Sequence, residues 1–132
     1  MIFIDSNVPM YLVGADHPNK ATARRVLERL IASGEPMITS AEVFQEILHR
    51  YAALRRLDAV APAFAVLYGI ADEIFEIGVA DVERARAWVV ARDGLSARDA
   101  LHAAVMEREG VHRILSFDGG FDGLGFVTRV FD

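Results

Sequence analysis

Three aspartates stand at places in this chain where their carboxylates can do chemistry together. Asp5 and Asp118 each follow a short apolar run, and Asp99 begins an apolar stretch with helical spacing. Carboxylate oxygens are ligands that Mg²⁺ and Mn²⁺ take in proteins. Ions held in this way lower the pKa of a water molecule, align it with a phosphodiester and neutralise charge on the leaving oxygen. If these carboxylates lie close together in the folded chain, we expect metal-dependent phosphodiester hydrolysis that needs no Lys or His as a general base.

Asp5 has two explanations that its local sequence leaves open. The residue leads into Ser6 and Asn7, and Asp, Ser and Asn are all favoured at the N-cap of a helix. Taken alone, Asp5 is better explained as such a cap. In the functional interpretation Asp5 is a metal ligand at a strand end, and Ser6 and Asn7 orient it through polar contacts.

The other two aspartates carry similar alternatives. Ser96 followed by Asp99 is similar to a capping box, and the helix dipole favours an acid in the first turn. The stretch after Asp99 is nevertheless apolar enough to pack deeply, which would hold the carboxylate at the mouth of a buried helix. Asp118 begins an Asp-Gly dipeptide, which a plain turn explains. It also follows a predicted central strand, which would place it on the same sheet edge as Asp5.

Two glutamates in the helix predicted after Ser40 compete for a place near the aspartates. At about 100° per residue, Glu46 points roughly 130° from the centre of the apolar face and Glu42 roughly 170° from it. Glu46 can therefore lean toward a cleft beside the packed face, whereas Glu42 is expected in solvent. The spacing favours Glu46, and a solvated helix face is the alternative for both.

The elements that must position these residues follow from the apolar pattern. Short apolar runs predict five strands, at residues 1–4, 36–39, 74–77, 111–116 and 126–130. Helical spacing predicts helices over residues 17–33, 40–51, 57–71 and 79–92, and another that begins at Ser96. Strands that alternate with helices predict an α/β fold with a parallel sheet and helices on both faces. Ligand sites in such sheets lie beyond the carboxyl ends of the strands, near the point where the strand order reverses.

The composition limits the class of protein. The length of 132 residues fits one domain over residues 1–132, and the apolar content of 53% argues against a disordered chain. Because there is no cysteine, a bound metal would need oxygen or imidazole ligands. No basic region precedes an apolar run at the N-terminus, and no apolar stretch approaches the roughly 20 residues of a membrane span. We therefore expect a cytoplasmic protein without a membrane partner.

The net charge of −5 argues against nucleic-acid binding through diffuse electrostatics, for which a basic excess is expected. The objection weakens if clustered carboxylates hold divalent cations, because the ions reverse the local charge. The basic residues are also grouped rather than evenly spread. The two groups are Lys20, Arg24, Arg25 and Arg29, and Arg50, Arg55 and Arg56.

The four histidines show no pairing that is typical of metal ligands. His49 falls on the polar side of its predicted helix, and His102 follows Asp99 by three residues. We interpret all four, which include His17 and His112, as structural or surface residues. Only His102 is placed where it can line the site.

The ordered motifs resemble those of PIN domains, and more narrowly those of the VapC toxins of toxin–antitoxin pairs. The resemblance covers the whole chain through Ile4 to Val8, Ser40 followed by Glu46, Leu95 to Ala104, and Leu115 to Asp118. It implies a three-layer α/β/α sandwich with a parallel sheet of about five strands. It also implies an endoribonuclease that depends on Mg²⁺ or Mn²⁺ and commonly forms a homodimer. A cognate antitoxin is expected to inhibit it by laying a segment into the groove near the active site.

The resemblance also assigns roles to residues by position. It implies four catalytic acids, Asp5, Glu46, Asp99 and Asp118, of which Asp5, Asp99 and Asp118 bind the metal. Small polar residues beside the metal correspond to Ser6, Asn7 and Ser116. Many relatives carry a further acid two residues after the one that matches Asp118, and here that position is Gly120. Asp122 is a candidate to replace it at a different spacing, so the number of bound ions and the level of activity stay open.

Two other functions are open from the sequence alone. In an acid-nucleophile phosphatase, Asp5 would attack phosphate covalently. That class usually needs a second acid two residues on, where this chain has Asn7, and a Lys on the phosphate, and Lys20 is the only lysine. A catalytically weak or inactive binding module is the other alternative, suggested by Gly120 and by the negative net charge.

Overall fold

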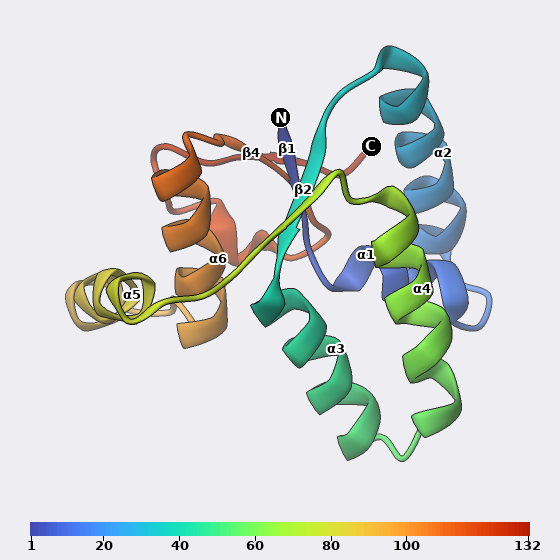
Figure 1. Ribbon diagram of the computed structural model, residues 1–132, viewed down its shortest axis with the longest axis horizontal. Coiled ribbons are helices and arrows are strands. Elements are labelled where there is room, and N and C mark those ends of the chain that lie inside the picture. Colours follow the sequence, from blue (N-terminus) through green and yellow to red (C-terminus); the bar gives the residue numbers. More distant parts are fainter.

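Five short strands pair side by side in one parallel sheet (Figure 1). The computed structural model describes residues 1–132. The strands are β1 (Ile2–Ile4), β2 (Met37–Ser40), β3 (Glu73–Phe75), β4 (Arg113–Leu115) and β5 (Thr128–Val130). Their order across the sheet is β3-β2-β1-β4-β5, and every pairing is parallel. The parallel sheet of about five strands is thus confirmed.

The strand order reverses at β1, which lies between β2 and β4. β1 pairs Ile2 with Met37 on one side and Ile4 with Leu115 on the other. The chain moves outward from β1 through β2 to β3, and β4 and β5 then extend the sheet in the opposite direction. The connections that follow β1 and β4 therefore run away from each other at the carboxyl ends of these strands. Sheets of this type bind ligands at that place. Asp5 is the first residue after β1.

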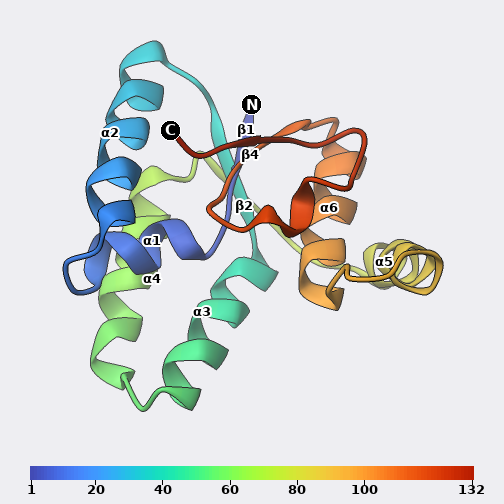
Figure 2. The ribbon, with the colours of Figure 1, turned by 180° about the vertical axis from the view of Figure 1, so that it is seen from behind.

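Helices cover both faces of the sheet (Figures 1 and 2). One face carries α1 (Asn7–Val13), α2 (Pro18–Ser33) and α4 (Val60–Ile70), and α1 contacts the other two. The opposite face carries α6 (Ala97–Glu109), and α5 (Val79–Ala91) packs against α6. Helix α3 (Ala41–Ala53) continues from β2 beyond the carboxyl end of the sheet and contacts both α4 and α6. This is the three-layer α/β/α sandwich that was predicted.

β1 lies at the centre of the hydrophobic core. Ile2, Phe3 and Ile4 are fully buried, as expected for a strand inside a parallel sheet whose two faces are covered by helices. They belong to a core cluster of 24 buried apolar residues. Burial of each large apolar side chain contributes about 1.5–3 kcal/mol, so β1 is a rigid anchor for the residues that follow it.

The observed elements differ from the predicted ones in two places. Helix α1 begins at Asn7, where the sequence indicated only a turn or the start of a helix. The predicted helix over residues 57–71 divides into a 3-10 turn, η1 (Leu57–Ala59), and α4. Pro62 lies in the first turn of α4, where its missing N–H costs no helical hydrogen bond. None of the helices is both long enough and apolar enough to span a bilayer.

Candidate active site

Asp5 is buried at the carboxyl end of β1, and both of its carboxylate oxygens are held in place. The residue is 2% exposed. Oδ1 accepts a hydrogen bond from the backbone N–H of Ser6 at 2.7 Å, and Oδ2 accepts one from the Ser116 hydroxyl at 2.7 Å. The backbone N–H of Asp5 donates to the carbonyl of Leu115 at 3.1 Å. Asp5 is therefore fixed by β4 as well as by β1.

Asn7 and Ser116 connect the ends of these two strands. The Asn7 amide donates to the Ser116 hydroxyl at 3.3 Å and to Asp5 Oδ2 at 3.4 Å. Its carbonyl oxygen accepts a hydrogen bond from the backbone N–H of Phe117 at 3.3 Å. The Ser116 hydroxyl in turn accepts one from the backbone N–H of Asp118 at 3.0 Å. Asn7 and Ser116 thus set the position of Asp5 relative to the loop that carries Asp118.

Glu46 reaches the same place from α3. It is 9% exposed, and its Oε1 accepts a short hydrogen bond from the Ser6 hydroxyl. Its Oε2 lies 3.9 Å from Nε of Arg98, at the start of α6. Glu42 is half-buried, and its pKa is raised because burial disfavours its charge. The expectation that Glu42 points freely into solvent is therefore wrong, because α6, which carries Arg98 and His102, packs against α3 and partly covers Glu42.

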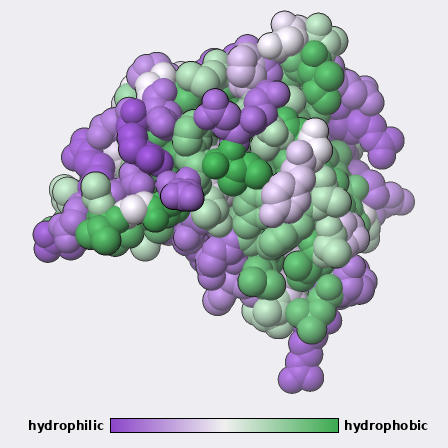
Figure 3. Space-filling view, in the orientation of Figure 1, coloured by the Kyte–Doolittle hydropathy of each residue, from purple (hydrophilic) through white to green (hydrophobic).

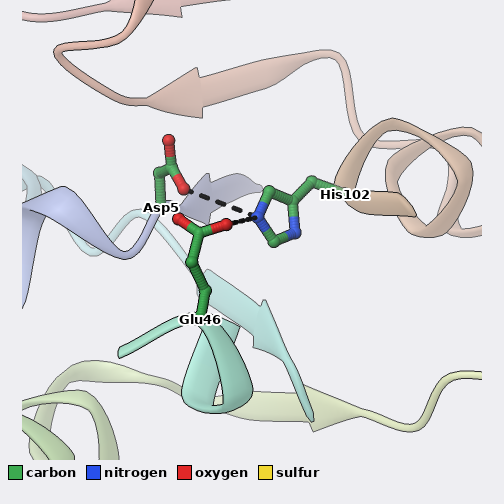
Figure 4. A group of neighbouring side chains, drawn as sticks. All are labelled: Asp5, Glu46 and His102. Atoms are coloured by element: carbon green, nitrogen blue, oxygen red, sulfur yellow. Dashed lines mark ion pairs between the residues drawn. The ribbon is translucent and has the colours of Figure 1, made fainter. Parts of the chain in front are cut away.

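His102 faces both Asp5 and Glu46 through one ring nitrogen, Nε2 (Figure 4). The ring is completely buried, and its Nε2 is 3.4 Å from Glu46 Oε2 and 3.6 Å from Asp5 Oδ1. The rings of Phe3 and Phe121 pack around it, with centroids 5.4 Å and 6.3 Å away. The sequence placed His102 at most on the lining of the site. Its position one turn after Asp99 on α6 was the available signal, because residues three apart share a helix face.

Asp99 and Asp118 approach each other across Gly120. Asp99 is half-buried in the first turn of α6. Asp118 caps the 3-10 turn η2 (Gly119–Phe121), and its Oδ1 accepts a hydrogen bond from the backbone N–H of Gly120 at 2.9 Å. A Cβ at position 120 would lie 2.7 Å from Asp99 Oδ2 and 3.3 Å from Asp118 Oδ1. The glycine therefore leaves open the space that these two carboxylates share.

Asp122 does not join the other acids. Its carboxylate forms a two-point ion pair with the guanidinium of Arg129, at 2.8 Å from Nε and 3.0 Å from Nη2. The side chain is 56% exposed. The expectation that Asp122 takes the place of an acid at position 120 is wrong, because its carboxylate is paired with Arg129 of β5 and is absent from the lining of the cleft over the other acids.

A polar cleft opens over this group of residues. Its volume is about 560 Å³, and three of the acids, Glu46, Asp99 and Asp118, line it. Arg50 and Arg98 lie on its α3 and α6 walls. The rest of the lining is His49, Ala53, Leu54, Gly94, Ser96 and Gly120. The cleft therefore brings carboxylates and guanidinium groups together in its lining.

Burial and mutual repulsion disfavour negative charge on two of the aspartates. Burial raises the pKa of Asp5. Burial also raises the pKa of Asp99 to about 6, and the carboxylates of Asp118 and Asp5 add to the shift. A positive charge placed among these groups would relieve both effects.

For Glu46 and His102, in contrast, the surroundings favour the charged forms. Burial alone would raise the pKa of Glu46, but the His102 ring and the Ser6 hydroxyl lower it overall. Burial alone would lower the pKa of His102, but the carboxylates of Glu46 and Asp5 raise it overall. Each group thus favours the charged form of the other.

The donor set fits a divalent cation. Asp5, Glu46 and His102 each offer a ligand atom, and these atoms lie within 4.8 Å of one another. Both ring nitrogens of His102 lack a hydrogen-bond partner, which is rare for buried polar atoms. Gly120 keeps space free beside Asp99 and Asp118. Oxygen and imidazole donors were the only ligand types that the cysteine-free sequence allowed.

Comparisons with known proteins agree with this geometry. The family model described as PIN domain matches residues 2–127. The chain belongs to the PIN-domain family. A ribonuclease named VapC13, from Mycobacterium tuberculosis, is 50% identical over 130 residues, which cover 98% of this PIN domain and 99% of the relative.

Solved structures show the same fold. The crystal structure of VapC20 from M. tuberculosis, described as a toxin that cleaves the sarcin–ricin loop, has a TM-score of 0.79 and 30% identity to this PIN domain. That match covers 96% of this chain and 97% of VapC20. A toxin–antitoxin complex from Klebsiella pneumoniae has a TM-score of 0.66 at 16% identity, and covers 97% of this chain and 96% of its own. The predicted family resemblance is confirmed.

Proposed function

We propose that this PIN domain is a metal-dependent endoribonuclease of the VapC type, which hydrolyses RNA phosphodiesters at the carboxylate cluster. One observation carries the proposal. Asp5, Glu46, Asp99 and Asp118 come from four separate segments and converge where the strand order reverses. The 50% identity with a VapC ribonuclease over nearly the whole chain supports the same assignment.

The side chains divide into those that hold the ion and those that orient them. Asp5, Asp99 and Asp118 are the proposed metal ligands, and Glu46 is the fourth acid of the site. Ser6, Asn7 and Ser116 fix the two strand-end acids through hydrogen bonds. When bound, Mg²⁺ or Mn²⁺ supplies Lewis-acid activation of water and neutralises charge on the phosphate.

The cleft supports RNA as the substrate. The net charge of −5 opposes binding to a polyanion over the whole surface, but the cleft places Arg50 and Arg98 beside the acids. Guanidinium groups bind phosphate oxygens through charge-assisted hydrogen bonds. The two arginines are therefore suited to hold phosphates that flank the one to be cleaved.

The phosphatase alternative finds no support in the geometry. The residue two positions after Asp5 is Asn7, whose amide is used to connect the ends of β1 and β4. The ammonium group of Lys20 donates to the carbonyl of Gly14 at 2.9 Å, and Lys20 does not line the cleft. No lysine is therefore placed to hold a phosphate over Asp5.

A cognate antitoxin and a second copy of the chain are the proposed protein partners. The fold similarity to a toxin in a toxin–antitoxin complex supports the antitoxin. Apolar surface over α3 and α4 supports a contact with either the antitoxin or a second copy of the chain (Figure 3). Its exposed residues include Leu48, Leu54, Leu57 and Tyr68. Size-exclusion chromatography with light scattering, with and without the product of the neighbouring upstream gene, tests both partners.

The proposed activity is tested on total RNA with purified, antitoxin-free protein. We expect cleavage into discrete fragments with Mn²⁺ or Mg²⁺, and no cleavage with EDTA. Absence of cleavage with either metal would instead support the inactive binding module. Cleavage that continues in EDTA would contradict the role of the metal.

A further inference from the structure

We infer that His102 is a nitrogen ligand of a divalent transition-metal ion that it holds together with Asp5 and Glu46, so that this site prefers such ions to Mg²⁺. The inference rests on the proposed metal-dependent function and adds Glu46 and His102 to the ligands proposed above, with Asp5 shared between the two sets. It begins from a buried imidazole that faces two carboxylates without a hydrogen bond to either (Figure 4).

The distances leave room for an ion shared by the three side chains. Nε2 of His102 lies 3.4 Å from Glu46 Oε2 and 3.6 Å from Asp5 Oδ1. Hydrogen bonds from N–H to oxygen are about 2.7–3.2 Å long, so both contacts are longer than is usual, and neither ring nitrogen has a hydrogen-bond partner. Ligands about 2.1 Å from one octahedral ion lie about 3.0 Å apart when adjacent and about 4.2 Å apart when opposite. Both separations fall between those two values.

The packing holds the imidazole in this position. Phe3 of β1 and Phe121 of η2 lie against the ring, and α6 supplies its backbone. The ring therefore cannot turn toward water to find a partner for its nitrogens. With its proton on Nδ1, the lone pair of Nε2 points at two carboxylates, and a metal cation between them then takes the place that a proton on Nε2 would otherwise fill.

The donor set and its burial determine which ions bind best. Mg²⁺ gives up its water ligands reluctantly and prefers oxygen donors, whereas imidazole suits transition metals. Asp5 is 2% exposed and His102 is fully buried, so an ion between them would lose most of its water. These conditions disfavour Mg²⁺ and favour an ion such as Mn²⁺, Co²⁺ or Zn²⁺.

The test uses Mn²⁺ as the probe and does not depend on catalysis. Pulsed electron paramagnetic resonance of the 132-residue chain with Mn²⁺ should show nitrogen modulation from a coordinated imidazole. Labelling the histidines with ¹⁵N should change that modulation without altering the protein. The signal should vanish in His102→Gln and persist in His49→Gln, a matched change at the histidine that lines the cleft.

Calorimetry supplies the second measurement. We expect His102→Gln to weaken Mn²⁺ binding by about tenfold or more, as loss of metal-site contacts commonly does, and to weaken Mg²⁺ binding less. Equal weakening of both ions would overturn the inference and leave His102 as a positioning residue. Circular dichroism checks that the variant folds, and if it does not, the ¹⁵N comparison on the unaltered chain decides.

The outcomes separate this inference from the proposed function. If Mn²⁺ binds and RNA is cleaved but no nitrogen modulation appears, then a proton occupies Nε2 and the ligand role is wrong. If the wild-type chain binds no Mn²⁺ and cleaves no RNA with any metal, the proposed function fails together with the inference.

Discussion

At the scale of single residues, the site concentrates negative charge that the fold alone does not neutralise. Asp99 shows this most clearly, because burial and the neighbouring Asp118 and Asp5 raise its pKa to about 6. In an unfolded chain the same carboxyl has a pKa near 3.8. The stabilising contribution of its protonated form is therefore complete below about pH 4 and is lost as the pH rises through about 6.

Asp99→Asn should stabilise the metal-free protein at neutral pH. The variant removes a carboxylate whose charge opposes folding, so its free energy of unfolding at pH 7 should exceed that of the wild type by about 1–2 kcal/mol, discounted for partial exposure. Urea denaturation in EDTA at pH 4.5 and pH 7 measures the difference, which should be much smaller at the lower pH. Asp122→Asn is the control and should lower stability at pH 7, because Arg129 lowers the pKa of Asp122.

The same pKa predicts the pH dependence of metal binding. A proton and a metal ion compete for Asp99, and the proton is lost near pH 6. Mn²⁺ affinity measured by calorimetry should therefore rise steeply between pH 5 and pH 7, and should rise less in Asp99→Asn. A flat affinity in the wild type over this range would contradict Asp99 as a ligand.

Gly120 gives a third test at the residue scale. Gly120→Ala places a Cβ 2.7 Å from Asp99 Oδ2, so the Asp99 carboxylate must move and metal affinity should fall by about tenfold. Gly125→Ala is the matched control, because a Cβ there meets nothing within 4 Å. If Gly120→Ala binds metal as tightly as the wild type, then position 120 does not shape the site.

At the scale of elements, each acid depends on how its helix or strand begins or ends. β1 and β4 end together because they are paired, so Asp5 and Ser116 meet. Helix α6 begins at a cap formed by the Ser96 hydroxyl, which accepts a hydrogen bond from the backbone N–H of Asp99 at 3.1 Å. That cap fixes the first turn and therefore the backbone of Asp99.

Loss of the α6 cap should affect both stability and the site. Ser96→Ala should lower the free energy of unfolding by about 1 kcal/mol and weaken metal binding, because the first turn of α6 frays. Ser96→Thr keeps a hydroxyl and should restore most of both properties. Chemical denaturation and calorimetry on the same samples measure the two effects, and an unchanged Ser96→Ala would show that packing alone positions α6.

The sequence predicted those elements whose periodicity is strong and local. Apolar spacing predicted the parallel sheet and the helices α2, α3, α5 and α6. It also predicted that Glu46 points closer than Glu42 to the packed side of α3. Helix α1 was not predicted because it is only seven residues long, contains Pro9 and has no side-chain cap. It is held instead by its contacts with α2 and α4, and contacts between distant segments leave no local pattern.

The central place of His102 could not be predicted for the same reason. Its burial depends on Phe3 and Phe121, which are distant from it in the sequence. Its contacts with Asp5 and Glu46 require the packing of α3 and α6 across the end of the sheet. Asp122, in contrast, was expected in the site but lies outside it. Its partner Arg129 lies on β5, in a register that the sequence does not reveal.

At the scale of the whole molecule, a net negative charge is compatible with an RNA substrate because the charges are unevenly placed. The acids gather at the carboxyl end of the sheet, and three of them, Glu46, Asp99 and Asp118, line a cleft of about 560 Å³ together with Arg50 and Arg98. Cations bound to the acids would make this region locally attractive to a polyanion. The site, rather than the total charge, therefore decides what the protein binds.

We propose that Asp5 and the acids around it form one metal-dependent ribonuclease site. The most direct test compares Asp5→Asn with the wild type, side by side, in the cleavage rate of a labelled RNA over a titration of Mn²⁺. The variant keeps the size of the side chain and removes the charge from the carboxylate that β1 and β4 fix in place. We predict a loss of cleavage of at least about 100-fold, about 2.7 kcal/mol in the barrier, at every metal concentration. Undiminished cleavage by a folded Asp5→Asn protein would show that this site does not carry the activity.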